Sequence, residues 1–153
     1  MSYVTGEALL LAQLRQVNGL DADSARRNDV RILNRGKAAA YAVLRPGPFT
    51  REVASIGGLG IGPMTIFYRW TTYCDVYQRI GPDYPASVEA LTALEQLIMD
   101  RLDQYRLAGD TTGAIQDVFV TAGSDPAEIL NGRWAMRTLT IAWTEEVQVT
   151  LQE

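Results

Sequence analysis

Histidine is absent from this chain of 153 residues, and cysteine occurs once, at Cys74. Without histidine, the protein has no His-based catalytic triad, no imidazole metal ligand and no common general base near neutral pH. With one cysteine, it has no internal disulfide and no thiolate metal cluster. We therefore expect a protein that is not an enzyme and that binds no metal and no cofactor.

Lysine is also scarce, since Lys37 is the only one among 14 basic residues, and 18 acidic residues bring the net charge to −4. This acidity argues against a dedicated nucleic-acid-binding protein. No apolar run approaches the roughly 18–20 residues of a membrane helix, and the first residues lack the features of a signal peptide. We expect synthesis in the cytoplasm, no membrane partner, and one domain over residues 1–153.

Two strand-like segments, residues 64–80 and 133–151, stand out by their length. Each is roughly three times the usual strand of about five or six residues. Their alternation predicts one buried phase in each: Met64, Ile66, Tyr68, Trp70, Cys74, Val76 and Ile80 in the first, and Ala135, Leu139, Ile141, Trp143, Val147, Val149 and Leu151 in the second. The opposite faces carry Phe67, Tyr73, Tyr77, Trp134 and Met136. We expect a neighbouring subunit to cover these large side chains.

The first half of the chain suggests a helix followed by a hairpin. Thr5 is a suitable N-cap for a helix that runs to about residue 18, with Gly19 as its stop. Residues 21–28 are polar and turn-like, and residues 30–33 fit a short strand or a pinned loop. Residues 37–45 and 50–56 are predicted to form a hairpin around Pro46-Gly47-Pro48.

The second half contains the best predicted helix. It begins between residues 84 and 87, continues with apolar residues at three- and four-residue spacing, and stops at Gly109. A strand over 115–121 and a helical turn over 126–130 follow, and Asn131-Gly132 opens the last long strand. This order predicts an α+β fold. Its mainly antiparallel sheet holds two long strands, a long amphipathic helix packs across it, and a second helix lies at the N-terminus.

Possible chemical sites fail on a missing residue or a wrong spacing. The glycine-rich segment 57–62 lacks the GxGxxG spacing of a phosphate loop and precedes a strand, so we expect a flexible loop that contacts a neighbour. The segment 110–113 (DTTG) fits a plain turn, and Asp21 and Asp23 lack the further ligands of a calcium loop. Cys74 lies in the buried phase and is expected to act as a small hydrophobic residue.

Four segments, taken in order, carry a family resemblance: GEALLLAQL, TIFYRWTTYCDVYQRI, ASVEALTALEQLIMDRLDQY and RWAMRTLTIAWTEEV. With the hairpin between the first two, they resemble the tail terminator or tail completion (neck) proteins of long-tailed bacteriophages, including the minor tail protein of the lambdoid group. That resemblance implies a ring, commonly hexameric, at the head-proximal end of the tail tube. Such a ring ends tube polymerisation and joins the tail to the head connector.

The same resemblance implies the partners and the location of the protein. The partners would be further copies of the chain, the tail tube protein and the head–tail connector or stopper protein, and DNA would only pass through the lumen. The protein would be found in the virion tail or neck after assembly in the host cytoplasm. The family supplies no catalytic residues.

Six residues of the two long strands are our candidates for the subunit interface: Arg69, Asp75, Tyr77, Trp134, Arg137 and Glu145. Two alternatives stay open. One is a head-completion or stopper protein of the neck. The other is a non-viral α+β module that holds a ligand between sheet and helix, which requires converging polar groups on the helix-facing side of the sheet. The sequence instead places mainly Met64, Ile66, Trp70, Leu139 and Ile141 there.

Overall fold

A computed structural model of the protein describes residues 3–55, 63–108, 116–123 and 125–150. These residues form an α+β fold with one sheet of six strands and three helices, which confirms the predicted class. The sheet order is β1-β2-β3-β6-β4, and β5 pairs separately with β6. The strand bounds are Ala25–Arg27 for β1, Ala40–Ser55 for β2, Pro63–Arg79 for β3, Gln116–Ala122 for β4, Ala127–Ile129 for β5 and Trp134–Thr150 for β6.

The sheet is built around three long strands. β3 pairs antiparallel with β2 on one side and with β6 on the other, along nearly its whole length. β4 and β5 are antiparallel to β6, whereas β1 runs parallel to β2. The two long strands predicted from the alternation are therefore confirmed as β3 and β6. The third long strand, β2, was not predicted.

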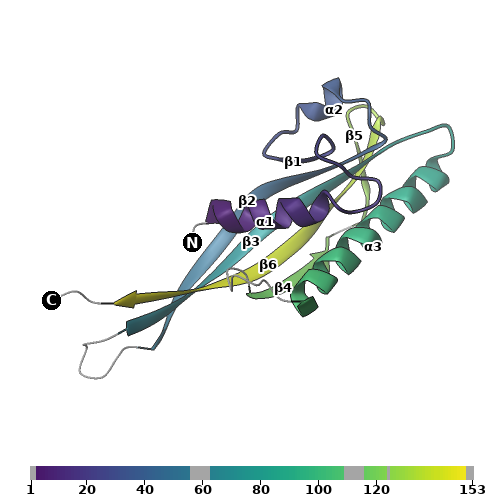
Figure 1. Ribbon diagram of the computed structural model, residues 1–153. Coiled ribbons are helices and arrows are strands. Elements are labelled where there is room, and N and C mark those ends of the chain that lie inside the picture. Colours follow the sequence, from purple (N-terminus) through teal and green to yellow (C-terminus); the bar gives the residue numbers. More distant parts are fainter. Residues whose placement is uncertain (1–2, 56–62, 109–115, 124, 151–153) are drawn as a thin grey trace.

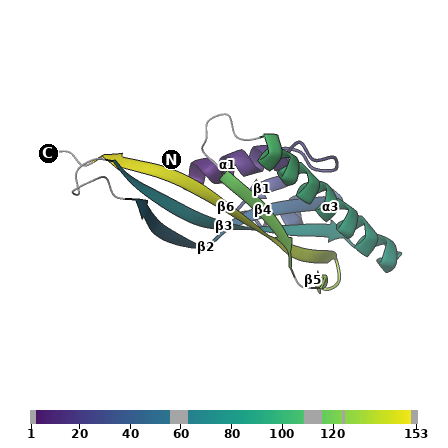
Figure 2. The same ribbon diagram turned by 90° about the horizontal axis from the view of Figure 1, so that it is seen from below.

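Helices α1 (Tyr3–Leu14) and α3 (Tyr84–Ala108) cover one face of the sheet, here called the helix face (Figures 1 and 2). The apolar stripe of α3, which includes Leu91, Ile98 and Leu102, is buried against the sheet, and this confirms the predicted amphipathic helix. In α1, Gly6 leaves no space for a Cβ atom against the ring of Trp143. A glycine at this point is what allows α1 to lie so close to β6.

The opposite face of the sheet, here called the back face, is covered only at one end. There α2 (Ile32–Arg35) and β5 close over a second apolar cluster. Its buried members are Leu33, Tyr41, Val43, Tyr77 and Trp134. The chain thus has a main core under α1 and α3 and a smaller one on the back face.

The predicted hairpin around Pro46-Gly47-Pro48 is wrong. β2 continues through these residues, and the extra residues form a bulge between Pro46 and Phe49. Among the described strands, β1 pairs with β2 only at residues 42–44, so no partner at this edge requires the missing proline N–H groups. The hairpin partner of β2 is β3, and the glycine-rich segment 57–62 between them lies outside the described residues.

Four shorter predictions are also corrected. Residues 126–130 contain strand β5 (Ala127–Ile129) rather than a helical turn. β5 makes a hairpin with β6, and the turn between them includes Leu130, Asn131 and Gly132, which all have positive φ. The polar segment 21–28 contains β1, and residues 30–33 lead into the helical turn α2. Thr5 is no N-cap, because α1 begins at Tyr3 and ends at Leu14, well before residue 18.

Candidate functional site

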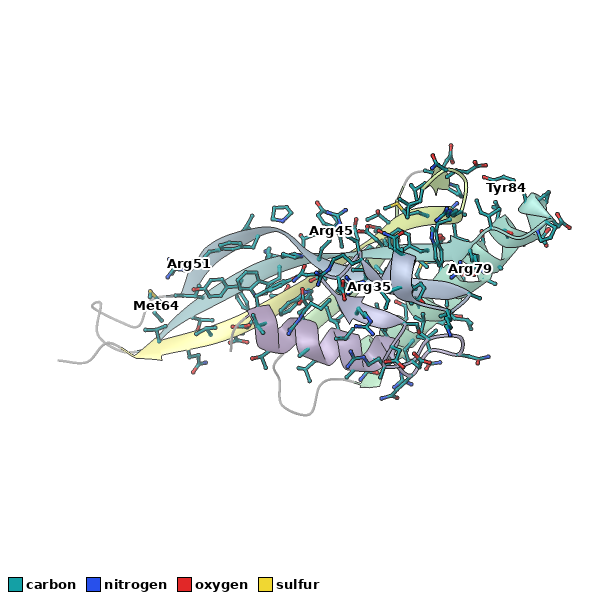
Figure 3. All side chains as sticks on the ribbon, turned by 90° about the horizontal axis from the view of Figure 1, so that it is seen from above. Arg35, Arg45, Arg51, Met64, Arg79 and Tyr84 are labelled. Carbon is teal, nitrogen blue, oxygen red and sulfur yellow. The ribbon has the colours of Figure 1, made fainter. Side chains whose placement is uncertain are left out.

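The three long strands extend beyond α1 as a three-stranded arm (Figures 1 and 2). The arm consists of residues 49–55 of β2, 63–70 of β3 and 143–150 of β6. Figure 3 shows Arg51 and Met64 on the arm, at the far end of the sheet from Arg79 and Tyr84. The helix layer therefore covers the body of the sheet and leaves the arm to project from it.

Aromatic rings fix α1 to the base of the arm. The ring of Tyr3 lies 5.3 Å from that of Trp70 and 5.8 Å from that of Trp143. Its hydroxyl donates to Glu7 Oε2 at 2.7 Å and lies 2.9 Å from Thr72 Oγ1, which accepts from Trp143 Nε1 at 3.1 Å. Burial raises the pKa of Tyr3 above its ordinary value, so the phenol stays protonated as a donor.

The two faces of the arm differ in polarity, although Arg51 lies on the helix face and the partly buried Phe67 on the back face. On the helix face, Phe49 is 56% exposed, Val53 47% and Val149 38%. On the back face lie Thr50, Glu52, Arg69, Glu146 and Gln148, which follow from the alternation and the register with β3. Soluble proteins seldom leave several large apolar side chains together on a projecting segment, so the helix face of the arm is a candidate contact surface.

A groove of about 310 Å³ lies where the arm meets the body. Its lining has one charged residue, Arg69, and otherwise consists of aromatic and small residues: Phe49, Trp70, Trp143, Pro48, Thr50, Thr71, Ala142 and Thr144. Most of these side chains are small and uncharged. The groove therefore offers shape and hydroxyl groups to a partner, without a set of converging charges.

Arg69 is the predicted interface residue that lies on the arm surface. Its side chain is 62% exposed and forms an ion pair with Glu52 at 3.6 Å. Glu145 also lies on the arm, on the helix face beside Tyr68, but it is buried. Its neighbour Glu146 is exposed on the other face, so the two carboxylates point apart.

Asp75 is buried on the back face and engaged within the chain. Its carboxylate accepts from Arg45 Nε at 2.8 Å and from Thr138 Oγ1 at 2.7 Å. The hydrogen bond to Asp75 raises the pKa of the Arg45 guanidinium, which also lies over the ring of Tyr73 at 4.4 Å. Asp75 therefore joins three strands of the sheet, and its burial needs no second subunit.

Tyr77 and Trp134 are covered by the chain itself, which corrects the expectation that a neighbour covers them. Both lie in the second apolar cluster, where the rings of Tyr41 and Trp134 are 5.6 Å apart. The guanidinium of Arg79 lies over Trp134 at 4.6 Å. Burial raises the pKa of Tyr77 to about 12. Phe67, Tyr73 and Met136 are only partly buried.

Arg137 lies on the helix face, where its Nη1 donates to Glu95 Oε2 of α3 at 2.7 Å. Glu95 is buried, and burial raises the pKa of its carboxyl although Arg137 acts in the opposite direction. This pair ties the long helix to β6. Like the Tyr3–Thr72 contact, it is a polar contact between a helix and the sheet, rather than a converging set of groups aimed at a ligand.

The other chemical candidates give no site in the described part of the chain. No group of three or more His, Cys, Asp or Glu side chains there is arranged to hold a metal ion. Cys74 is fully buried, which raises the pKa of its thiol and confirms its role as a small core residue. Asp21 Oδ1 accepts from the backbone N–H groups of Asp23 and Ser24, and these bonds lower its pKa in an ordinary turn. Residues 110–113 lie outside the described ranges.

Sequence reasoning missed Phe49, Val53 and Val149 as an exposed set. Phe49 and Val53 were assigned to the turn and return strand of the wrong hairpin, and Val149 to the buried phase of β6. The available signal was that no sequence element remained to cover the distal ends of strands this long. No protein-family model matches the sequence, and no curated protein matches it. None of the described helices is long and apolar enough to cross a membrane.

Proposed function

We propose that the protein is a structural assembly protein of a long-tailed bacteriophage. In this proposal it forms a homo-oligomeric ring, hexameric as in the tail terminator proteins it resembles, at the head-proximal end of the tail tube. The ring ends polymerisation of the tube and joins the tail to the head connector. The observation that carries the proposal is the three-stranded arm. It projects beyond the helix layer, and apolar side chains on its helix face are exposed.

The physical support is the difference between the body and the arm in how their apolar residues are covered. The body buries most of its large apolar residues in two clusters of its own, although it exposes single ones such as Val30 and Phe119. The arm instead exposes Phe49, Val53 and Val149, although its central residue Ile66 is buried. Ring subunits need two different complementary surfaces on each copy, and a projecting arm beside a compact body provides them.

The back face of the arm suits a surface toward a lumen through which DNA passes. It carries Thr65, Thr144 and the partly buried Phe67, and its exposed arginine, Arg69, is paired with Glu52. Such a surface is wetted by water but presents no unpaired row of positive charge that would retain DNA. The tail tube protein and the connector would then bind the two ends of the ring.

The test is the molecular mass of the purified protein, measured by light scattering alone and after mixing with tail tube protein. We expect a multiple of the 16.9 kDa chain mass and binding to tube ends that stops their growth. A strict monomer that neither forms rings nor binds tube ends would overturn the proposal. Binding to head connectors but not to tube ends would favour the head-completion alternative, and a small molecule retained in native mass spectrometry would favour a ligand-binding module.

A further inference from the structure

Among the described residues, the arm has two open strand edges. In the described residues, β1 pairs with β2 only at residues 42–44, and the pairing of β4 and β5 with β6 ends at Thr144. Beyond these points, β2 and β6 are each paired only with β3. Residues 49–53 and 145–149 therefore present backbone N–H and C=O groups outward on opposite sides of the same arm.

These edges carry only part of the usual protection against pairing. Sheet proteins block open edges with lysine, proline, bulges or very short strands. Here Pro46, Pro48 and the first bulge stop short of Phe49, and the single lysine, Lys37, lies before β2. The arm itself has a second register shift between Val53 and Ser55, and its charged edge residues are opposite in sign on the two sides at Arg51 and Glu145. The exposed side chains on the two edges include the β-branched Val53 and Val149, which favour strand pairing.

We infer that the arms of neighbouring copies pair edge to edge, the outer edge of β2 in one copy with the outer edge of β6 in the next. This inference rests on the proposed ring. Both strands are antiparallel to β3, so they run in the same direction, and copies related by rotation about an axis along the arms pair them in parallel. Each copy then uses one edge of each kind, and a closed ring leaves no edge open.

Pairing of β2 in one copy with β6 in the next satisfies both edges better than pairing of like strands. Joining β6 to another β6 would place Glu145 and Glu146 beside the same two carboxylates, and like charges across strands destabilise a sheet. Joining β2 to another β2 in a two-fold dimer would leave both β6 edges open. The β2–β6 pairing instead brings Arg51 toward the acidic edge and places Val53 beside the helix-face valines of β6.

Cysteine cross-linking tests this pairing, because the native Cys74 is fully buried and does not compete for a thiol reagent. The variants are Thr50→Cys on β2 and Glu146→Cys on β6, both exposed on the back face of their edges and diagonal neighbours in the register that sets Arg51 beside Glu145. We expect no cross-link from either single variant with a short bis-maleimide, dimers from their 1:1 mixture, and a ladder up to the ring size from the double variant. Gln96→Cys, exposed on α3, is the matched control that stays uncross-linked.

Each outcome bears on the pairing separately from the ring. Rings by mass without cross-links in the double variant would overturn the edge pairing and leave the proposed function standing. Dimers from Thr50→Cys alone would show a two-fold contact, and a cross-link of Thr50→Cys to tail tube protein instead of a second copy would show a foreign strand on the edge; both overturn it. The absence of any ring would defeat both proposals.

A second set of variants removes the dependence on cross-linking geometry. Val149→Lys places the usual protective residue on the β6 edge, and we expect the protein concentration for half-assembly to rise about tenfold or more while the melting temperature of the monomer stays unchanged. Val30→Lys is the matched control, because Val30 is similarly exposed but lies outside the arm. Equal assembly of the two variants would overturn the inference.

Discussion

Replacing Gly6 with alanine tests how closely α1 docks on the sheet at the base of the arm. Two effects oppose each other. Alanine favours a helix over glycine by about 1 kcal/mol. The new Cβ atom, however, has no space against the ring of Trp143, which is buried and held by its hydrogen bond to Thr72. Overpacking of this kind typically costs about 1–3 kcal/mol.

The steric effect is expected to prevail because the helix cannot move alone. A shift of α1 away from Trp143 also lifts Tyr3 from Thr72, and a lost hydrogen bond costs about 0.5–1.5 kcal/mol. The net loss of unfolding free energy is therefore about 1–3 kcal/mol. For a chain of this size, that corresponds to a fall in the melting temperature of roughly 3–10 °C.

Urea denaturation followed by far-UV circular dichroism and tryptophan fluorescence measures this loss. The matched control is Ala8→Gly, an exposed position of the same helix, which should cost no more than about 1 kcal/mol. A Trp143→Phe background, with a smaller ring opposite Gly6, should reduce the penalty of Gly6→Ala. If Gly6→Ala is instead as stable as the natural protein, or more stable, then α1 does not dock as closely as described.

Three further predictions concern the buried groups. Burial raises the pKa of Glu95. The stability that Glu95 contributes is therefore complete below its unfolded-state pKa of about 4.3 and is lost as the pH rises through its folded-state pKa. Glu95→Gln should flatten the profile of unfolding free energy between about pH 4 and 7 in urea titrations, and an unchanged profile would contradict this. In the same assay, Arg45→Leu should lower the unfolding free energy by about 2 kcal/mol and Asp75→Asn by about 1 kcal/mol. The loss is larger for Arg45→Leu because removal of the half-exposed arginine leaves a buried carboxylate unpaired. A larger loss for Asp75→Asn would contradict the assigned burial. Trp134→Ala should lower the unfolding free energy by about 3–5 kcal/mol. If neighbouring subunits contact the arm and not the aromatic cluster around Trp134, light scattering should show an unchanged oligomeric state for the folded fraction of this variant.

Local patterns predicted much of the fold, and the failures have one physical cause. The periodicity of α3 and the alternation in β3 and β6 arise because each segment has one face against the core. These patterns can therefore be recognised in the sequence. The Pro46-Gly47-Pro48 segment breaks a strand only where a neighbouring strand needs its N–H groups. That condition depends on β1 ending its pairing at residue 44, which no local pattern reveals.

The interface candidates show the same limit. Alternation assigned Trp134 and Tyr77 to the back face correctly, but the covering groups, such as Leu33 of α2, come from distant segments. Arg137 falls in the same strand phase as the core residue Leu139, so the sequence indicates that it faces the helices. The sequence does not indicate that its ion-pair partner is Glu95 on α3. A side chain's face follows from strand geometry, but what covers that face is a property of the tertiary structure.

The distribution of satisfied and unsatisfied groups separates the body of the protein from its arm. In the body, the buried charges of Asp75 and Glu95 have arginine partners, and the back-face aromatic residues have a cluster of their own. On the arm, the backbone edges and the exposed Val53 and Val149 lack comparable cover within the described chain. Scattered exposed apolar residues are ordinary, but apolar edges at both sides of one projecting sheet are a costly arrangement for an isolated monomer. The arm is therefore the part of this molecule on which the proposed assembly is most directly tested.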